Sequence, residues 1–208
     1  MLAMKQVILG AGGAVGVALA QNWPQAGAAL RLVARQPKAV LGKEEIFAAD
    51  LLDPQATKEA VKGCQVAYLT VGLPYRAALW EKQWPQIMAN VLNACAEADC
   101  RLVFFDNIYM YRCRGMADMT EDQPLDPCSR KGKVRLAIAD QLLSAHQRGE
   151  VKALIARSAD FYGPGIAQTS ILNETIIKPI ATGKATQWLG DLDQPHSFTY
   201  VSDAAQAI

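Results

Sequence analysis

The sequence predicts an α/β fold built on a doubly wound parallel sheet. The first observation is that short apolar runs alternate with longer amphipathic segments along most of the 208 residues. The short runs are almost continuously apolar, which is typical of parallel strands covered by helices on both faces. The second observation is a glycine-rich turn after the first apolar run, where a strand would pass directly into a helix.

Six apolar runs are expected to form the strands. They lie at Gln6–Gly10, Ala28–Ala34, Ile46–Ala49, Val66–Val71, Leu102–Phe105 and Ala153–Ala156. Helices are expected between them, at about Ala14–Trp23, Gln55–Lys62, Ala77–Ala98 and Lys131–Arg148. Pro85 limits or kinks the third helix, because proline removes a helical hydrogen bond. After Arg157 the pattern loosens into segments punctuated by glycine and proline, as expected at an irregular ligand-binding edge.

Composition and charge exclude several classes of protein. Hydrophobic residues make up 51% and charged residues 20%, which is ordinary for a globular protein and argues against disorder. The 21 basic and 20 acidic side chains give a net charge of +1. Nucleic-acid and membrane-surface binding are disfavoured because both need a large positive field. No apolar run is long enough to span a membrane, and the first nine residues resemble mature sequence more than a signal peptide.

The cysteines and histidines suggest no metal site. The five cysteines are an odd number without a CxxC pair, and the two histidines lie far apart. We therefore expect reduced thiols and a cytoplasmic protein rather than a disulfide framework. The cysteines are Cys64, Cys95, Cys100, Cys113 and Cys128.

The glycine-rich turn predicts a dinucleotide site and a Rossmann-type sheet. Glycines let the backbone approach a pyrophosphate, whose charge the free N–H groups of a helix N-terminus attract. The spacing of Gly10, Gly13 and Gly16 is GxxGxxG. The residues expected to contact the cofactor here are Gly10, Gly12, Gly13, Ala14, Val15 and Gly16.

The end of the second strand predicts which dinucleotide binds. A carboxylate there would bind the ribose hydroxyls of NAD, but Arg35 follows the strand and no carboxylate occurs before Glu44. A guanidinium suits a 2′-phosphate, so we expect NADP rather than NAD. The alternative is that Arg35 is an ordinary solvated side chain.

Four motifs are spread along the chain, namely the GxxGxxG turn, Asp50–Asp53, Arg157–Gly165 and Phe198–Asp203. In these motifs the chain resembles the short-chain dehydrogenase/reductase superfamily, in its extended or atypical branch, the NAD-dependent epimerase/dehydratase family. The resemblance covers essentially the whole chain. The resemblance implies that Asp50 and Leu51 contact the adenine. It also implies that the backbone of Val71 and Gly72 lies against the phosphates and ribose, and that Phe161 approaches the nicotinamide.

The catalytic pattern of this family is altered. Its members use a tyrosine and a lysine four residues later, with a serine at the preceding strand end. In the helix expected at Lys131–Arg148, the buried face is set by Val134, Ala137, Ile138, Leu142 and Ala145. Lys131 should therefore point inward, whereas Lys133 and Arg135 should not. Pro127 stands four residues before Lys131, and Asn107 stands in the place of the serine.

Three interpretations of this altered site remain open. In the first, the protein is an active NADP-dependent enzyme. Tyr109 or Tyr111 is the acid, Lys131 is the positioning residue, and Asn107 orients the substrate. In the second, it binds NADP(H) without turnover, as a redox sensor or regulator. In the third, these side chains only pack the loop.

The resemblance further implies oxidoreduction, epimerisation or dehydration of a small carbonyl, sugar or sugar-nucleotide substrate. Tyr75, Arg76 and His196 are candidates to bind that substrate, and a homodimer is possible. Residues 1–208 are expected to form a single NAD(P)-binding domain, in which residues 160–208 contribute a small, truncated substrate lobe.

Overall fold

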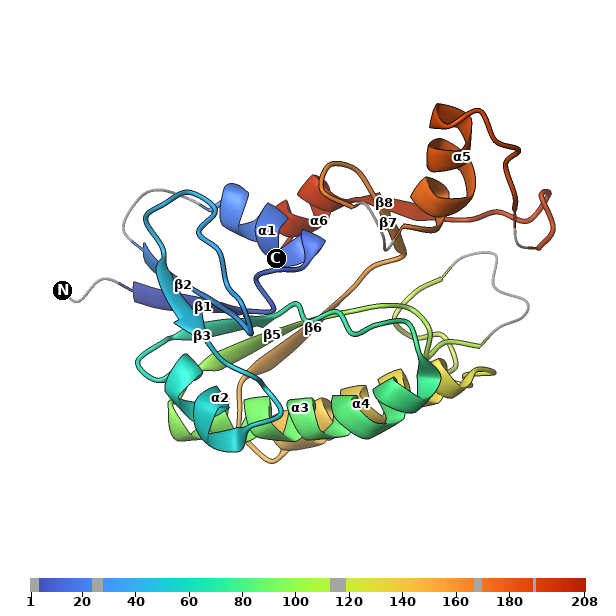
Figure 1. The fold of residues 1–208 in the computed structure, drawn as a ribbon. Helices are drawn as coiled ribbons and strands as arrows, with labels where there is room; N and C mark the ends of the chain where they lie inside the picture. Colours follow the sequence, from blue (N-terminus) through green and yellow to red (C-terminus); the bar gives the residue numbers. More distant parts are fainter. Residues whose placement is uncertain (1–3, 24–27, 113–118, 167–169, 189) are drawn as a thin grey trace.

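The computed structural model describes residues 4–23, 28–112, 119–166, 170–188 and 190–208. Its centre is a six-stranded, entirely parallel sheet with the strand order β3-β2-β1-β4-β5-β6 (Figure 1). The predicted α/β fold is therefore confirmed. The strands are β1 (Met4–Leu9), β2 (Ala28–Ala34), β3 (Glu45–Ala48), β4 (Val66–Leu69), β5 (Arg101–Asp106) and β6 (Ala153–Arg157).

Helices cover the two faces of this sheet unequally. One face carries α2 (Pro54–Val61), α3 (Ala77–Glu97) and α4 (Arg130–Gln147), and the other carries α1 (Ala14–Gln21) and α6 (Val201–Gln206) (Figure 1). Successive residues of β1 enter two separate apolar clusters, because side chains alternate across a strand. Val7 and Leu9 pack with the first group of helices, and Ile8 packs with the second.

The helices begin near the residues that the sequence predicts. Asp53 caps α2, where its carboxylate accepts hydrogen bonds from the amides of Gln55 and Ala56. Pro85 lies inside α3, which continues through it. No helix in the described part of the chain is both long and apolar enough to cross a membrane.

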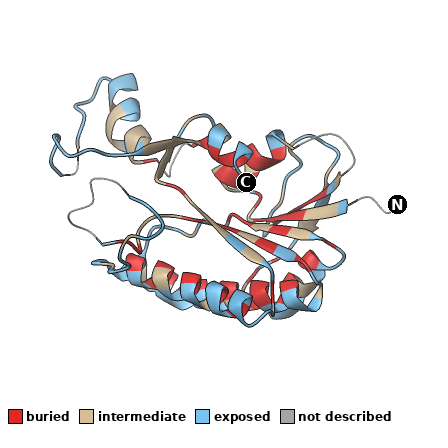
Figure 2. Cartoon of the chain, turned by 180° about the vertical axis from the view of Figure 1, so that it is seen from behind, coloured by how far each residue is buried: buried red, intermediate tan, exposed pale blue. Residues whose placement is uncertain are grey.

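The chain after β6 forms a smaller unit that the sequence did not predict in detail. Residues 160–162 (β7) and 198–200 (β8) pair in parallel, and between them lie a π-helical turn (Asn173–Ile177) and α5 (Lys178–Ala181). Figure 2 shows that α5 has no buried residues, whereas α6 contributes buried residues against α1. The two strands of this unit are thus joined through a long, mostly exposed connection.

Two expectations about α4 are wrong. Arg135 is buried, with only 4% of its side chain exposed, and Ala137 is exposed. A helical pattern assigns charged residues to the solvent side. Here the guanidinium of Arg135 pairs with a buried carboxylate and lies against three aromatic rings. The inward face of α4 is therefore partly charged.

The expectation that the thiols are all reduced is wrong. Cys128, just before α4, is disulfide-bonded. Spacing in the sequence does not reveal which cysteines meet in the fold. Cys64, Cys95 and Cys100 are free and buried, and Cys113 lies outside the described residues.

Candidate functional site

The glycine-rich turn follows β1 at the carboxyl edge of the sheet. Gly10 has a φ of +102°, and a Cβ there would lie 2.6 Å from the amide nitrogen of Val71. A Cβ on Gly16 would lie 2.7 Å from the carbonyl oxygen of Gly10. Both positions therefore require glycine for the turn to close.

Gly12 is different, because a Cβ there would meet nothing within 4 Å. It precedes Gly13, the N-cap of α1, so the turn leaves open space beside a helix N-terminus. The first amides of α1, those of Ala14 and Val15, have no partner within the helix. Open space beside unpaired amides suits a pyrophosphate, so these residues could hold a dinucleotide.

The end of β4 lies directly against this turn. The hydroxyl of Thr70 donates to the carbonyl oxygens of Leu9 (3.3 Å) and Gly10 (3.4 Å). Val71 is half-buried beside Gly10, and Gly72 is exposed. The Thr70 hydroxyl, for which no pattern in the sequence predicts a role, thus fixes the backbone that would line a bound cofactor.

Three predicted cofactor residues follow β2 and β3. Arg35 is exposed. Asp50 is exposed too, and its carboxylate accepts a hydrogen bond from the amide of Leu52. Leu51 is buried, and its carbonyl oxygen accepts a hydrogen bond from the side chain of Asn90 on α3 (2.8 Å). Asp50 therefore shapes its own turn and keeps its carboxylate at the surface.

A cluster of aromatic rings surrounds Lys131 at the start of α4. The ammonium of Lys131 lies over the ring of Tyr75 and 5.8 Å from the ring centroid of Trp80. Tyr109 stacks on Trp80, with an angle of 14° between the planes, and its hydroxyl lies 3.4 Å from that of Tyr75. The structure thus brings together three residues that the sequence singled out, namely Tyr75, Tyr109 and Lys131.

Asn107 is held at the end of β5 by its own backbone. Its amide donates to Asp106 Oδ1 (2.8 Å), and its side-chain oxygen accepts from the amide of Tyr109 (3.0 Å). Asp106 is fully buried and pairs with Arg135. Burial raises the pKa of Asp106, and the charge of Arg135 counteracts that shift. This ion pair, which no local pattern in the sequence predicts, anchors the loop that carries Asn107 and Tyr109.

Tyr111 does not join the cluster. It is buried, and its hydroxyl accepts a hydrogen bond from Arg157 Nη1 at 2.8 Å. Arg157 is the last residue of β6, so Tyr111 ties the loop after β5 to the neighbouring strand. Its hydroxyl is already engaged in that contact.

Gly132 sets the distance between α4 and the loop after β5. A Cβ on this residue would collide with the carbonyl oxygen of Tyr109 and would lie 2.8 Å from the Cβ of Pro127. The glycine therefore lets the first turn of α4 approach Tyr109 closely, which also brings Lys131 to the rings. A single glycine within a helix pattern gave no such signal in the sequence.

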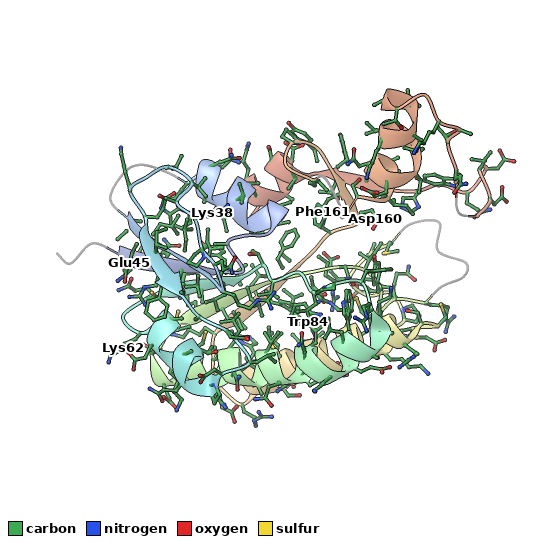
Figure 3. All side chains as sticks on the ribbon, in the orientation of Figure 1. Lys38, Glu45, Lys62, Trp84, Asp160 and Phe161 are labelled. Carbon is green, nitrogen blue, oxygen red and sulfur yellow. The ribbon has the colours of Figure 1, made fainter. Side chains whose placement is uncertain are left out.

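Phe161 and His196 belong to the smaller unit. Phe161 on β7 packs against Phe105 of β5, with ring centroids 5.4 Å apart, and Figure 3 shows it on the opposite side of the sheet from Trp84. His196 pairs with Asp160 at 2.9 Å and stacks on Phe198. Arg76 is exposed at the N-cap of α3. Within the described ranges, no three or more His, Cys, Asp or Glu side chains are grouped to hold a metal ion.

Several solved structures share this fold. MoeE5 in complex with UDP-glucuronic acid and NAD is 25% identical (TM-score 0.81), and the match covers 98% of this chain and 70% of that one. UDP-glucuronic acid 4-epimerase from Bacillus cereus, in complex with UDP-glucuronic acid and NAD, is 18% identical (TM-score 0.81; 98% and 71% covered). UDP-glucose 4-epimerase from Brucella ovis, in complex with NAD, is 15% identical (TM-score 0.84; 99% and 71% covered). No curated protein matches the chain.

The prediction of NADP is wrong. These three solved structures contain NAD, and the family whose sequence pattern matches the chain is described as NAD dependent. The prediction depended on Arg35, whose side chain is exposed at the end of β2. An arginine at this position is compatible with solvent, so its presence alone does not select a 2′-phosphate.

The family match extends over nearly the whole chain. The pattern of the NAD dependent epimerase/dehydratase family matches residues 6–208, from β1 to the end of α6. The match agrees with the parallel strand order, the glycine-rich turn and the motifs after β3, β6 and β8. The chain belongs to the NAD-dependent epimerase/dehydratase family.

Proposed function

We propose that the protein is an NAD-dependent enzyme that oxidises, epimerises or dehydrates a sugar nucleotide. Family membership supports this class of reaction, and MoeE5, at 25% identity, binds UDP-glucuronic acid together with NAD. The observation that carries the proposal is an arrangement at one edge of the sheet. The glycine-rich turn after β1 and the Lys131 cluster beyond β4 and β5 both lie at the carboxyl ends of parallel strands.

The residues fit NAD at this edge. The amides at the start of α1 and the open space at Gly12 would hold the pyrophosphate. Asp50 and Leu51 would contact the adenine, and the backbone of Val71 and Gly72 would line the ribose. Phe161 would border the nicotinamide. When bound, NAD would accept a hydride and return it.

The Lys131 cluster supplies the polar groups for the substrate. Lys131 would hold the nicotinamide ribose, and Asn107 would orient the reacting hydroxyl group. A phenol of the cluster, Tyr75 or Tyr109, would exchange its proton. We assign Tyr111 no such role, because its hydroxyl is buried against Arg157.

The smaller unit would contribute to substrate binding. We propose that residues 160–208 form part of a substrate lobe, with His196 and Arg76 at its border. A homodimer stays a prediction. A cytoplasmic location also stays a prediction. It was inferred from reduced thiols, and the disulfide at Cys128 argues against them.

The test combines cofactor binding with substrate oxidation. NAD should bind, and UDP-glucose or UDP-glucuronic acid should reduce the bound NAD, which absorbance of the reduced nicotinamide would measure. Lys131→Met should slow reduction by roughly 100-fold or more, the usual scale of a lost catalytic contact. Lys133→Met is the matched control, because Lys133 is exposed two residues away. Binding of NAD without oxidation of any sugar nucleotide would instead support a non-catalytic, NAD-binding regulator.

A further inference from the structure

The family's catalytic tyrosine position is occupied by Pro127 in this chain, four residues before Lys131. The proposed reaction still requires a group that takes the proton of the substrate hydroxyl. Two phenols lie beside Lys131, one from the loop after β4 and one from the loop after β5. Their surroundings differ enough to distinguish their roles.

Tyr75 is the exposed member of the pair. Its side chain lies on the loop that follows β4, at the edge where ligands bind in open parallel sheets, and the residue is 65% exposed. Its ring meets Trp80 edge-on, with centroids 5.8 Å apart, while the Lys131 ammonium covers the ring face. A substrate at this edge of the sheet can therefore reach the Tyr75 hydroxyl while the ring stays held from two sides.

Tyr109 is the enclosed member. It stacks on Trp80, its carbonyl faces Gly132, and its hydroxyl lies 3.4 Å from that of Tyr75. Burial raises the pKa of Tyr109 well above the usual tyrosine value, and the contact with Tyr75 raises it further. Tyr109 therefore keeps its proton. The Tyr75 hydroxyl donates to the Tyr109 oxygen in this structure, and Tyr109 would donate in return once Tyr75 has lost its proton.

We propose that Tyr75 is the catalytic acid–base residue of this site, with Lys131 as its charge partner and Tyr109 as a positioning residue. The inference rests on the proposed function. In the oxidation step, the Tyr75 phenolate would take the O–H proton of a secondary alcohol on the sugar while the alcohol carbon gives up a hydride, which NAD would accept when bound. A ketone and a neutral phenol would result. The return step would reverse both transfers.

The positive charge of Lys131 explains why this phenol suits the role. A cation over an aromatic face attracts the ring electrons, and the attraction grows when the oxygen carries negative charge. A hydrogen bond from Tyr109 to the ionised Tyr75 oxygen would act in the same direction, since bonds to a charged oxygen are the stronger ones. Both contacts come from groups that the fold holds in place through Trp80 and Gly132.

The first experiment measures reduction of bound NAD by UDP-glucose and by UDP-glucuronic acid in a single turnover. Tyr75→Phe should slow reduction by about 100-fold or more, whereas Tyr109→Phe should slow it by less than about tenfold, because the catalytic group itself remains. Tyr68→Phe is the control, since the Tyr68 hydroxyl on β4 bonds the side chain of Gln6 and its ring packs against Trp23, outside the cluster. NAD affinity should be the same in all three variants.

The second experiment does not depend on turnover. N-acetylimidazole acetylates accessible phenols, and mass spectrometry would follow Tyr75 and Tyr68 separately. NAD together with a UDP-sugar should protect Tyr75 and leave the reactivity of Tyr68, which lies on β4 outside the cluster, unchanged. Tyr75 is exposed without ligand, so protection would show that the substrate covers it.

The outcomes separate the inference from the function on which it rests. Full activity of Tyr75→Phe, or an unprotected Tyr75 in a protein that oxidises the sugar nucleotide, would overturn the inference alone. Failure of both UDP-sugars to bind or to reduce NAD in the unmodified protein would overturn the proposed function and the inference together. A larger loss in Tyr109→Phe than in Tyr75→Phe would reverse the two roles.

Discussion

At the scale of single residues, the glycines of the first turn have separable roles. Gly16 is packed against backbone, so a methyl group there has no room. Gly12 faces open space, so a methyl group there meets only what binds. The same substitution at two positions four residues apart should therefore affect stability in one case and cofactor binding in the other.

We expect Gly12→Ala to leave the free energy of unfolding within about 0.5 kcal/mol of the unmodified protein, as for an open surface position. Its NAD affinity should fall by roughly tenfold or more. The methyl group would crowd the pyrophosphate against the amides, and such overpacking costs about 1–3 kcal/mol of binding free energy. Gly16→Ala should lower stability itself by about 1–3 kcal/mol. Urea unfolding measures the stability and NAD titration measures the affinity. Unchanged NAD affinity in Gly12→Ala would contradict the placement of the pyrophosphate at this turn.

At the scale of elements, most of the sheet could be predicted from the sequence and the smaller unit could not. β2 coincides with its predicted range, and α1 and α3 begin at the predicted residues, since buried parallel strands and amphipathic helices leave strong patterns. β7 and β8 have three residues each and lie far apart in the chain, so no local pattern reveals their pairing.

The candidate site shows a similar division. The sequence identifies the glycine-rich turn, Asn107, Tyr109 and Lys131, because each stands at a recognisable distance from a motif. It misassigns Arg135, because the carboxylate that neutralises it, Asp106, lies 29 residues away. It likewise gives Gly132 no role, because the carbonyl of Tyr109 comes close only in the fold.

The start of α4 offers a test in which two effects oppose each other. Gly132→Ala improves helix propensity by about 1 kcal/mol, which would stabilise α4. The new Cβ collides with the backbone of Tyr109, and such strain costs about 1–3 kcal/mol or more. We expect the collision to dominate, so thermal unfolding should show a destabilised variant, and reduction of NAD should slow because Lys131 shifts.

Lys133→Ala is the control for this helix. Lys133 is exposed in the same turn, so its replacement should change stability by less than about 0.5 kcal/mol. A Gly132→Ala protein that is more stable than the unmodified one would mean that the helix and the loop can separate without cost.

At the scale of the whole molecule, cofactor binding should stabilise the fold, because NAD would bind the folded chain and not the unfolded one. At a concentration 100 times its Kd, a ligand adds about 2.7 kcal/mol. For a chain of this length we expect the midpoint of thermal unfolding to rise by roughly 5–10 °C. NADP at the same concentration should raise it less, and a larger shift with NADP would contradict the assignment of NAD.

Arg35→Ala provides the matched variant for this comparison. Because Arg35 is exposed, the unfolding midpoint of the variant without ligand should stay unchanged. Its shift with NAD should also equal that of the unmodified protein.

The stacking of Trp80 under Tyr109 has an optical consequence. Trp80 is buried beside Lys131 and Tyr75, within the cluster that would border a bound nicotinamide. Reduced nicotinamide absorbs where tryptophan emits, so it accepts excitation energy from a nearby indole, whereas the oxidised form does not. The fluorescence intensity of Trp80 would then fall when bound NAD is reduced and recover when it is reoxidised. The protein's own fluorescence would thus record each half of the reaction.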